Sequence, residues 1–238
     1  MSNNSFQFKQ FIIKQDRTVF KVGTDGVLLG SWVNISSVKK VLDIGTGTGL
    51  IALMLAQRTK AEIHAVETDD ASFLQAGENI RESPWPERIS LFHSSFQDFA
   101  RSNQAKYDLI VTNPPYFFDA IKSADDAKSM SRHHVRLSFH EILTGVSEVL
   151  EQSGLFALIL PVIEGKIFLS LANSYGFFLK RKTDVIPVAG KKAIRYLMEF
   201  TREKEHSIQE NELIVHHHTN REFTKDYREL TKDFYLCF

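Results

Sequence analysis

Residues 41–49 read Val41-Leu42-Asp43-Ile44-Gly45-Thr46-Gly47-Thr48-Gly49, a short apolar run that ends in three alternating glycines. A segment with helical character, Leu50 to Gln57, follows directly. Glycine occurs where a backbone turns sharply or lets a ligand approach closely, and a helix start offers N–H groups without intrahelical partners. The stretch therefore predicts a strand, a ligand-binding turn and a helix.

Outward from this stretch, strand-like and helix-like segments alternate. The clearest helix is predicted after Ser138, because apolar residues from Phe139 to Leu150 share one helical face and Ser138 forms a capping box with Glu141. Strands are expected at 41–44, 62–66, 89–92, 109–112, 155–160, 178–185 and 195–201, and further helices at 50–57, 70–81 and 163–173. This alternation predicts an α/β fold with a mainly parallel sheet, helices on both faces and ligands at the carboxyl ends of the strands.

The chain of 238 residues is long enough for a full core, and we expect residues 1–238 to form a single domain. No apolar run approaches the roughly 20 residues that span a bilayer. The polar start, residues 1–5, lacks the apolar core of a signal peptide, so we expect a cytoplasmic protein without membrane contact. The formal net charge of zero argues against coating of nucleic acid by bulk charge.

Several smaller features limit the kinds of site that the chain can form. The single cysteine, Cys237, excludes an internal disulfide and has no second cysteine with which to hold a metal. The run His216-His217-His218 is expected at a solvated strand end rather than at a metal ion, and we predict no metal site. Basic residues cluster at 132–136, 180–182 and 191–195, and each cluster is either a solvated face or a local contact with nucleic acid.

The spacing of the glycines indicates one class of cofactor. Gly45, Gly47 and Gly49 are spaced G-x-G-x-G, whereas a nicotinamide dinucleotide site would read G-x-G-x-x-G. Asp43 precedes the first glycine by two residues, and Glu67 ends the next expected strand, where a carboxylate can accept both hydroxyls of an adenosine ribose. This pattern resembles motif I of class I methyltransferases, and the resemblance implies S-adenosylmethionine as the cofactor, with S-adenosylhomocysteine as the product.

Two further segments are similar to parts of the same cofactor site. Asp98 and Phe99 resemble the position at which an acidic side chain accepts the adenine amine and the next residue packs on the ring. The second segment contains Lys21, Gly23, Thr24, Asp25 and Gly26. Its glycines and its Thr-Asp pair suit an amino-acid head group. We therefore expect residues 1–39 to form an N-terminal extension that contributes to the cofactor site.

The most specific motif is Asn113-Pro114-Pro115-Tyr116, after the strand expected at 109–112. Two prolines cannot donate ladder hydrogen bonds, and they fix the direction of the backbone. The amine of adenine is a weak nucleophile, because its lone pair is delocalised into the ring. If the Asn113 side-chain oxygen and the Pro114 carbonyl each accept one N–H, they position the amine and favour its pyramidal form, so that catalysis rests on placement and fixed dipoles. Asn113, Pro114, Pro115 and Tyr116 are thus the candidate catalytic residues, and Asn113 is also expected beside the cofactor.

The substrate base is expected on the aromatic side chains that follow. Tyr116 offers a ring face for stacking, and Phe117 extends it. A base in a folded nucleic acid must be splayed out to reach such a pocket. The polar stretch 119–135 includes Arg132, a candidate RNA contact, although a tolerated surface loop explains the stretch nearly as well.

With these motifs in place, the chain resembles the bacterial enzymes that methylate N6 of adenine 37 in a valine tRNA. The resemblance extends over nearly the whole length, including 21–32, the motifs above, 195–201 and the closing Phe234-Tyr235-Leu236. It implies a class I fold with seven strands, of which the last is antiparallel. It also implies a tRNA substrate, and we expect a monomer without a stable protein partner.

Three other functions also fit parts of the pattern. Enzymes that methylate a glutamine amide in a release factor carry the same Asn-Pro-Pro-Tyr motif, but they have a helical N-terminal domain for which the 40 or so residues before motif I are too few. DNA adenine methyltransferases mostly have a separate recognition domain. A non-catalytic RNA-binding protein on the same fold would not need intact Asp43 and Asn113.

Overall fold

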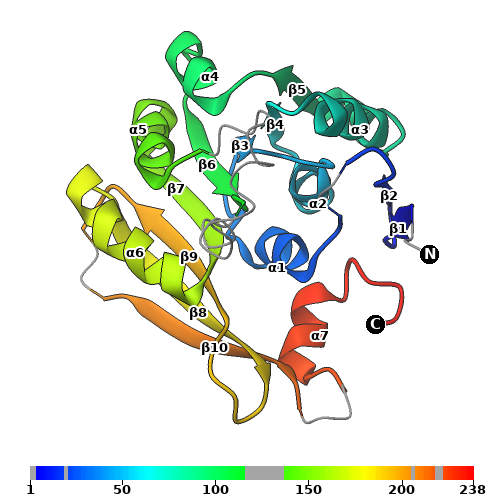
Figure 1. Cartoon of the computed structure of the whole chain (residues 1–238), viewed down its shortest axis with the longest axis vertical. Coiled ribbons are helices and arrows are strands. Elements are labelled where there is room, and N and C mark those ends of the chain that lie inside the picture. Colours follow the sequence, from blue (N-terminus) through cyan, green and yellow to red (C-terminus); the bar gives the residue numbers. More distant parts are fainter. Residues whose placement is uncertain (1–3, 19–20, 116–136, 205–206, 218–221) are drawn as a thin grey trace, which may run out of the picture.

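The computed structural model describes residues 4–18, 21–115, 137–204, 207–217 and 222–238. A twisted eight-stranded sheet runs through the centre (Figure 1). Its spatial order is β10 (Gln209–His216), β8 (Phe178–Val188), β9 (Arg195–Thr201), β7 (Leu150–Pro161), β6 (Tyr107–Thr112), β3 (Lys40–Ile44), β4 (Glu62–Glu67) and β5 (Ile89–His93). All neighbours are parallel except β9, which is antiparallel to both β7 and β8. The predicted mainly parallel sheet is confirmed.

Helices cover both faces of this sheet, as the alternation predicted. One apolar core includes residues of α1 (Thr24–Trp32), α2 (Leu50–Arg58), α3 (Asp70–Arg81) and α7 (Lys225–Thr231). A second core includes residues of α4 (Phe96–Ser102), α5 (Phe139–Val149) and α6 (Val162–Ala172). The capping box predicted at the start of α5 is present, since Ser138 and Glu141 exchange both of its hydrogen bonds.

The expected count of seven strands is wrong by one. The seven strands from β3 to β9 end with the antiparallel strand, as expected, but β10 adds an eighth strand at the edge, parallel to β8. Residues 209–212 of β10 are all exposed, and only Leu213 and Val215 are buried. An edge strand with two inward-facing apolar residues carries too weak an alternation to be recognised from sequence.

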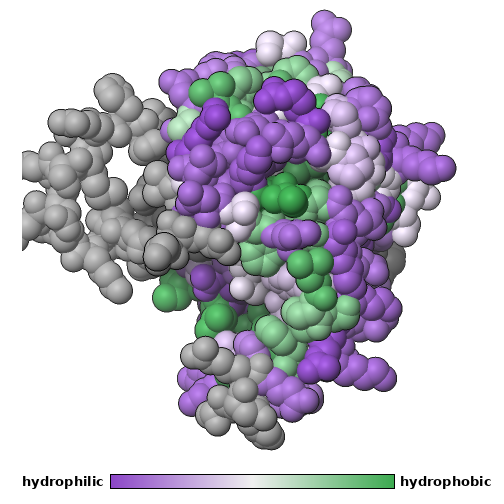
Figure 2. Space-filling view, turned by 90° about the vertical axis from the view of Figure 1, so that its right-hand side faces the viewer, coloured by the Kyte–Doolittle hydropathy of each residue, from purple (hydrophilic) through white to green (hydrophobic). Residues whose placement is uncertain are grey.

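The two ends of the chain lie on the same side of the molecule, beside α3 and α7 (Figure 1). The hairpin of β1 (Ser5–Gln7) and β2 (Ile12–Lys14) lies near the C-terminal tail, and the Lys9 N–H donates to the Phe234 carbonyl at 2.9 Å. The Phe8 and Tyr235 rings stack 6.1 Å apart. Figure 2 shows this side, where apolar residues form a patch within a mainly polar surface. Of the residues that the structure describes, none belongs to a helix long and apolar enough to cross a membrane.

Candidate active site

The candidate residues meet at the carboxyl edge of the sheet, above its three central strands. The glycine-rich turn follows β3, Glu67 ends β4, and Asn113 follows β6. Because β3 pairs in parallel with both β4 and β6, Ile44 lies opposite both Val66 and Thr112. Three motifs that are far apart in sequence are therefore brought to one place.

The glycine-rich turn leaves an open space beside its backbone. Gly45 and Gly47 have φ angles of +66° and +58°, which L side chains rarely adopt. A Cβ atom added to either glycine would meet no atom within 4 Å. The turn is anchored to the neighbouring strand, because the Gly45 N–H donates to the Val66 carbonyl at 2.9 Å. The positive φ angles account for glycine at these two positions, and the space beside them leaves room for a ligand that passes close to the backbone.

The Asp43 carboxylate lies fully buried beneath this turn. Its Oδ2 atom accepts hydrogen bonds from the Thr46 hydroxyl at 2.6 Å and from the Ala52 N–H at 3.1 Å. No described residue donates a hydrogen bond to its Oδ1 atom. Burial raises the pKa of Asp43 to about 7, although the two hydrogen bonds oppose that rise. A buried acceptor without a partner fits a site completed by a ligand that donates N–H groups or carries positive charge.

The raised pKa of Asp43 predicts a specific pH dependence of stability. The ordinary pKa is 3.8, so the unfolded chain loses this proton first as the pH rises. Between about pH 4 and pH 7 the free energy of unfolding should then fall by up to about 1.4 kcal/mol per pH unit from this group, with no further change above pH 7. We expect Asp43→Asn to gain stability relative to the wild type between pH 5 and pH 8. Urea midpoints at both values test this, and a difference that does not change with pH would contradict the raised pKa.

Glu67 is buried, and backbone donors fix the orientation of its carboxylate. Its Oε1 atom accepts from the N–H groups of Thr68 at 2.8 Å and Asp69 at 2.9 Å. Its Oε2 atom accepts from the Gly47 N–H at 2.8 Å. Each carboxylate oxygen has two lone pairs, so Oε2 retains room for a hydroxyl donor. The side chain thus connects the end of β4 to the glycine-rich turn.

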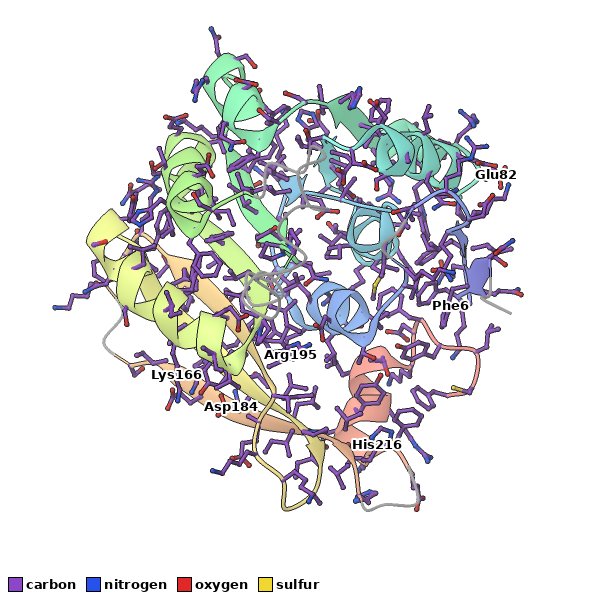
Figure 3. The ribbon with its side chains drawn as sticks, viewed as in Figure 1. Phe6, Glu82, Lys166, Asp184, Arg195 and His216 are labelled. Atoms are coloured by element: carbon purple, nitrogen blue, oxygen red, sulfur yellow. The ribbon has the colours of Figure 1, made fainter. Side chains whose placement is uncertain are left out.

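The start of α1 closes the other side of the site. A Cβ atom on Gly26 would lie 2.9 Å from Leu50 Cδ2 and 4.0 Å from Asn113 Nδ2, so α1 approaches both residues closely and a larger residue here would displace the Leu50 side chain. The Arg195 Nε atom donates to Asp25 Oδ2 at 2.8 Å, which ties α1 to the first residue of β9 (Figure 3). Sequence reasoning gave Arg195 no role in the site, because its partner lies 170 positions away.

Asn113 stands at the centre of this arrangement. Its Oδ1 atom is buried and has no hydrogen-bond partner among the residues that the structure describes. Pro114 is buried, whereas Pro115 is exposed. Leaving a buried acceptor unpaired costs roughly 1–3 kcal/mol, which a protein tolerates where the acceptor has a function.

The other predicted site residues are less closely grouped. The Asp98 carboxylate is exposed and accepts from the Ser95 hydroxyl at 2.7 Å. Phe99 is buried in the second core beside His64 and Phe92, so little of its ring is open to a ligand, and its contact with adenine stays a prediction. Lys21, Gly23 and Thr24 are exposed. Tyr116, Phe117 and Arg132 lie outside the described residues.

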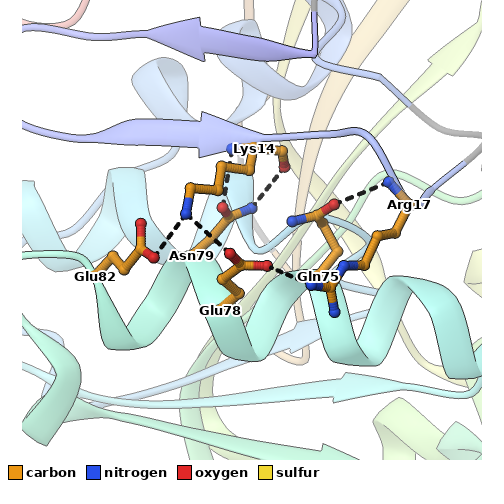
Figure 4. Close-up of polar contacts among 6 residues, drawn as sticks. All are labelled: Lys14, Arg17, Gln75, Glu78, Asn79 and Glu82. Atoms are coloured by element: carbon orange, nitrogen blue, oxygen red, sulfur yellow. Dashed lines mark hydrogen bonds and ion pairs between the residues drawn. The ribbon is translucent and has the colours of Figure 1, made fainter.

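Sequence analysis also missed a side chain that braces the glycine-rich turn. Asn79 of α3 is buried and pairs with the backbone of Lys14, accepting from its N–H and donating to its carbonyl, both at 2.9 Å (Figure 4). The same Asn79 amide donates to the Thr48 carbonyl in the turn at 2.9 Å. The Lys14 ammonium group bridges Glu78 and Glu82, so the N-terminal segment is fastened along α3. Nothing in the local sequence marks Asn79, since an isolated helical asparagine has no pattern of its own.

A metal site would need several His, Cys, Asp or Glu side chains gathered in one place. Across 4–18, 21–115, 137–204, 207–217 and 222–238, no group of three or more His, Cys, Asp or Glu side chains is placed to hold an ion. At the end of β10, the His216 Nδ1–H donates to the Pro187 carbonyl at 3.0 Å, and its ring stacks on Phe223. His216 thus lies at a strand end, as expected, whereas His218 lies outside the described residues.

Comparisons with known proteins agree with this geometry. The family described as Methyltransferase small domain matches residues 15–159, more than half of the chain. The chain is 43% identical over 237 residues to the tRNA1(Val) (adenine(37)-N6)-methyltransferase of Bacteroides fragilis, with 99% of both chains covered. It is 44% identical to the protein of the same name from Trichodesmium erythraeum, with 100% of both covered. A solved structure of a predicted O-methyltransferase from Agrobacterium tumefaciens superposes with a TM-score of 0.68 at 18% identity, covering 88% of this chain and 96% of that one, and supports the fold.

Proposed function

Since the chain belongs to the family of tRNA1(Val) (adenine(37)-N6)-methyltransferases, we propose that it methylates N6 of adenine 37 in a valine tRNA. The chain is an S-adenosylmethionine-dependent tRNA adenine N6-methyltransferase with a class I fold. The observation that carries the assignment of the catalytic residue is the unpaired, buried Oδ1 atom of Asn113 at the end of β6.

The residues around the glycine-rich turn fit S-adenosylmethionine, whose sulfonium supplies an activated methyl group when bound. The open space beside Gly45 and Gly47 admits a ligand against the backbone, and the αL turn at Gly49 starts α2 behind it. We assign to Glu67 the hydroxyls of the ribose, because its Oε2 atom retains a lone pair. The unpaired Oδ1 atom of Asp43 suits the charged amino-acid end of the cofactor.

The remaining cofactor contacts involve the start of α1 and the first turn of α4. The start of α1 lies beside Asn113 through Gly26, which supports a contribution of residues 1–39 to the site. We therefore propose that Lys21, Gly23, Thr24 and Asp25 hold the amino-acid head group of the cofactor. The exposed carboxylate of Asp98 is open to an adenine amine, whereas the burial of Phe99 limits that residue to edge contact.

Methyl transfer then follows from the placement of the target amine. One N–H of the N6 amine donates to Asn113 Oδ1 and the other to the Pro114 carbonyl, which favours the pyramidal form of the nitrogen and concentrates its lone pair on one side. Bound S-adenosylmethionine would supply the methyl group to this lone pair and would leave as S-adenosylhomocysteine, and the methylated amine would release one proton to solvent. Fixed acceptors supply the catalysis without a strong base. We propose that Tyr116 and Phe117 stack on the target base and that Arg132 contacts the RNA.

Glu67→Ala should weaken the binding of S-adenosylmethionine by about 1.5–3 kcal/mol, the size of a hydrogen bond to a charged group. Titration calorimetry measures the change directly. Glu67→Gln is the matched control, because it keeps one acceptor for the Gly47 N–H and should lose less affinity. An unchanged dissociation constant in the alanine variant would rule out the ribose contact.

The proposed function is tested by incubating the protein with labelled S-adenosylmethionine and unmodified total tRNA. We expect N6-methyladenosine after digestion, and mapping should place it at position 37 of a valine tRNA. Label in a protein substrate instead of tRNA would move the activity to glutamine methylation. If no methyl group is transferred to any substrate, the result would favour a non-catalytic RNA-binding protein with a methyltransferase fold.

The location and assembly of the protein are a separate part of the proposal. We propose a cytoplasmic enzyme, because tRNA modification takes place where tRNA matures, and we propose that it acts as a monomer, because the glycine-rich turn, Glu67 and Asn113 meet within a single fold. Light scattering in solution gives the oligomeric state, and a dimer mass would overturn the monomer.

A further inference from the structure

An exposed surface of basic and apolar side chains lies beside the active site, and nothing in the proposed chemistry uses it. We define it as the α6 patch, formed by Ile163, Lys166, Ile167, Lys191, Lys192 and Ile194. The isoleucine side chains are 58%, 52% and 47% exposed in chain order. Lys166 lies on α6 near Arg195 and the sheet edge in Figure 3. Single exposed apolar residues are common, but three beside three lysines form a distinct surface.

The patch belongs to the same edge of the sheet as the catalytic motif. β7 ends at Pro161, next to β6, and leads directly into α6. The turn between β8 and β9 returns at this edge, because Pro161 pairs with Arg195. The Ile194 carbonyl accepts from the Val162 N–H at 3.3 Å, which joins the turn to the start of α6. The patch is therefore one surface built from two segments.

A short series of contacts connects the patch to the catalytic asparagine. Ile194 precedes Arg195, whose guanidinium binds Asp25 at the start of α1. The next residue, Gly26, lies against Asn113. The patch is also held firmly, because a Cβ atom on Gly165 would lie 2.8 Å from the Tyr196 ring, so α6 packs closely on β9. A partner seated on the patch would thus be positioned relative to the target amine.

The charge of the patch selects its partner. Its three lysines make no ion pair with any residue that the structure describes, and Glu164, the acidic residue within α6, is buried. Arg195 at its margin is neutralised by Asp25. Free ammonium groups bind phosphates and release the counterions of a nucleic acid, while apolar side chains between them pack on riboses and unstacked bases.

We propose that the α6 patch binds the phosphate backbone of the substrate tRNA beside the methylated loop. This proposal rests on the proposed function, since it names the surface through which the same site takes its RNA. It also explains how a chain of zero formal net charge holds a polyanion, because three lysines without an ion pair to any described residue are gathered at the edge where the reaction takes place.

The test compares two triple variants with the same change of charge. K166A/K191A/K192A removes the lysines of the patch. K39A/K60A/K204A removes three exposed lysines at the opposite, amino edge of the sheet, before β3, before β4 and after β9. We expect the patch variant to raise Kd and KM for tRNA about tenfold or more and to reduce the slope of log Kd against log salt by about 2. Its kcat at saturating tRNA and its affinity for S-adenosylmethionine should stay unchanged, and the control triple should behave as the wild type.

A second pair of matched variants tests the apolar part of the patch. Ile163→Ser should raise Kd for tRNA several-fold, whereas Ile208→Ser, at a similarly exposed residue before β10, should not. If the K166A/K191A/K192A variant kept the wild-type Kd for tRNA and the wild-type dependence of that Kd on salt, the proposal would be overturned. If the wild type methylates no tRNA, the proposed function fails separately, and the same binding curves still decide whether the patch contacts RNA.

Discussion

We expect Asn113→Ala to lower kcat by about a hundredfold or more and to leave the affinity for S-adenosylmethionine nearly unchanged. Removal of one fixed hydrogen-bonding group at a reacting centre typically has an effect of this size, because the group acts on the transition state rather than on the bound cofactor. Single-turnover rates with tRNA and calorimetry with the cofactor measure the two quantities separately.

The structure adds a second expectation for the same variant. Asn113 Oδ1 has no hydrogen-bond partner in the described part of the chain, so truncation removes an unpaired buried acceptor and should not lower the melting temperature. Asn113→Asp keeps an acceptor in the same place and should retain more activity than the alanine variant. A near wild-type kcat in Asn113→Ala would remove the asparagine from the mechanism.

Gly47→Ala should weaken the binding of S-adenosylmethionine at least tenfold, equivalent to about 1.4 kcal/mol. Its backbone φ of +58° disfavours any side chain, and its added Cβ atom would stand in the open space assigned to the cofactor. The strain alone should also cost about 1–2 kcal/mol of folding stability. Calorimetry and urea unfolding separate the loss of affinity from the loss of stability.

Gly176→Ala is the control for this substitution. Gly176 has a φ of +76° and, like Gly47, has no atom within 4 Å of an added Cβ, but it lies in a turn before β8, at the amino edge of the sheet. Both variants should lose similar stability, and only Gly47→Ala should lose cofactor affinity. Equal affinities in the two variants would show that the open space beside Gly47 is not the cofactor site.

The central strands and their turn could be predicted because their signals are local. The apolar run before Gly45, the helix after Gly49 and the capping box at Ser138 each lie within a few residues, and the structure contains all three. The edge strand β10 could not be predicted in the same way. An exposed edge has little need of apolar residues, so only its pairing with β8 makes it a strand.

The sequence by itself determined which chemical groups stand at the strand ends: the glycines after β3, the carboxylate that ends β4 and the asparagine after β6. Parallel strands bring such groups to one edge whatever the details of packing. Only the tertiary structure decided their partners. It paired Arg195 with Asp25, fastened Asn79 to both Lys14 and Thr48, and buried the Phe99 ring in the core. These contacts depend on how helices and sheet edges from distant parts of the chain pack together, and no local pattern of residues encodes that geometry.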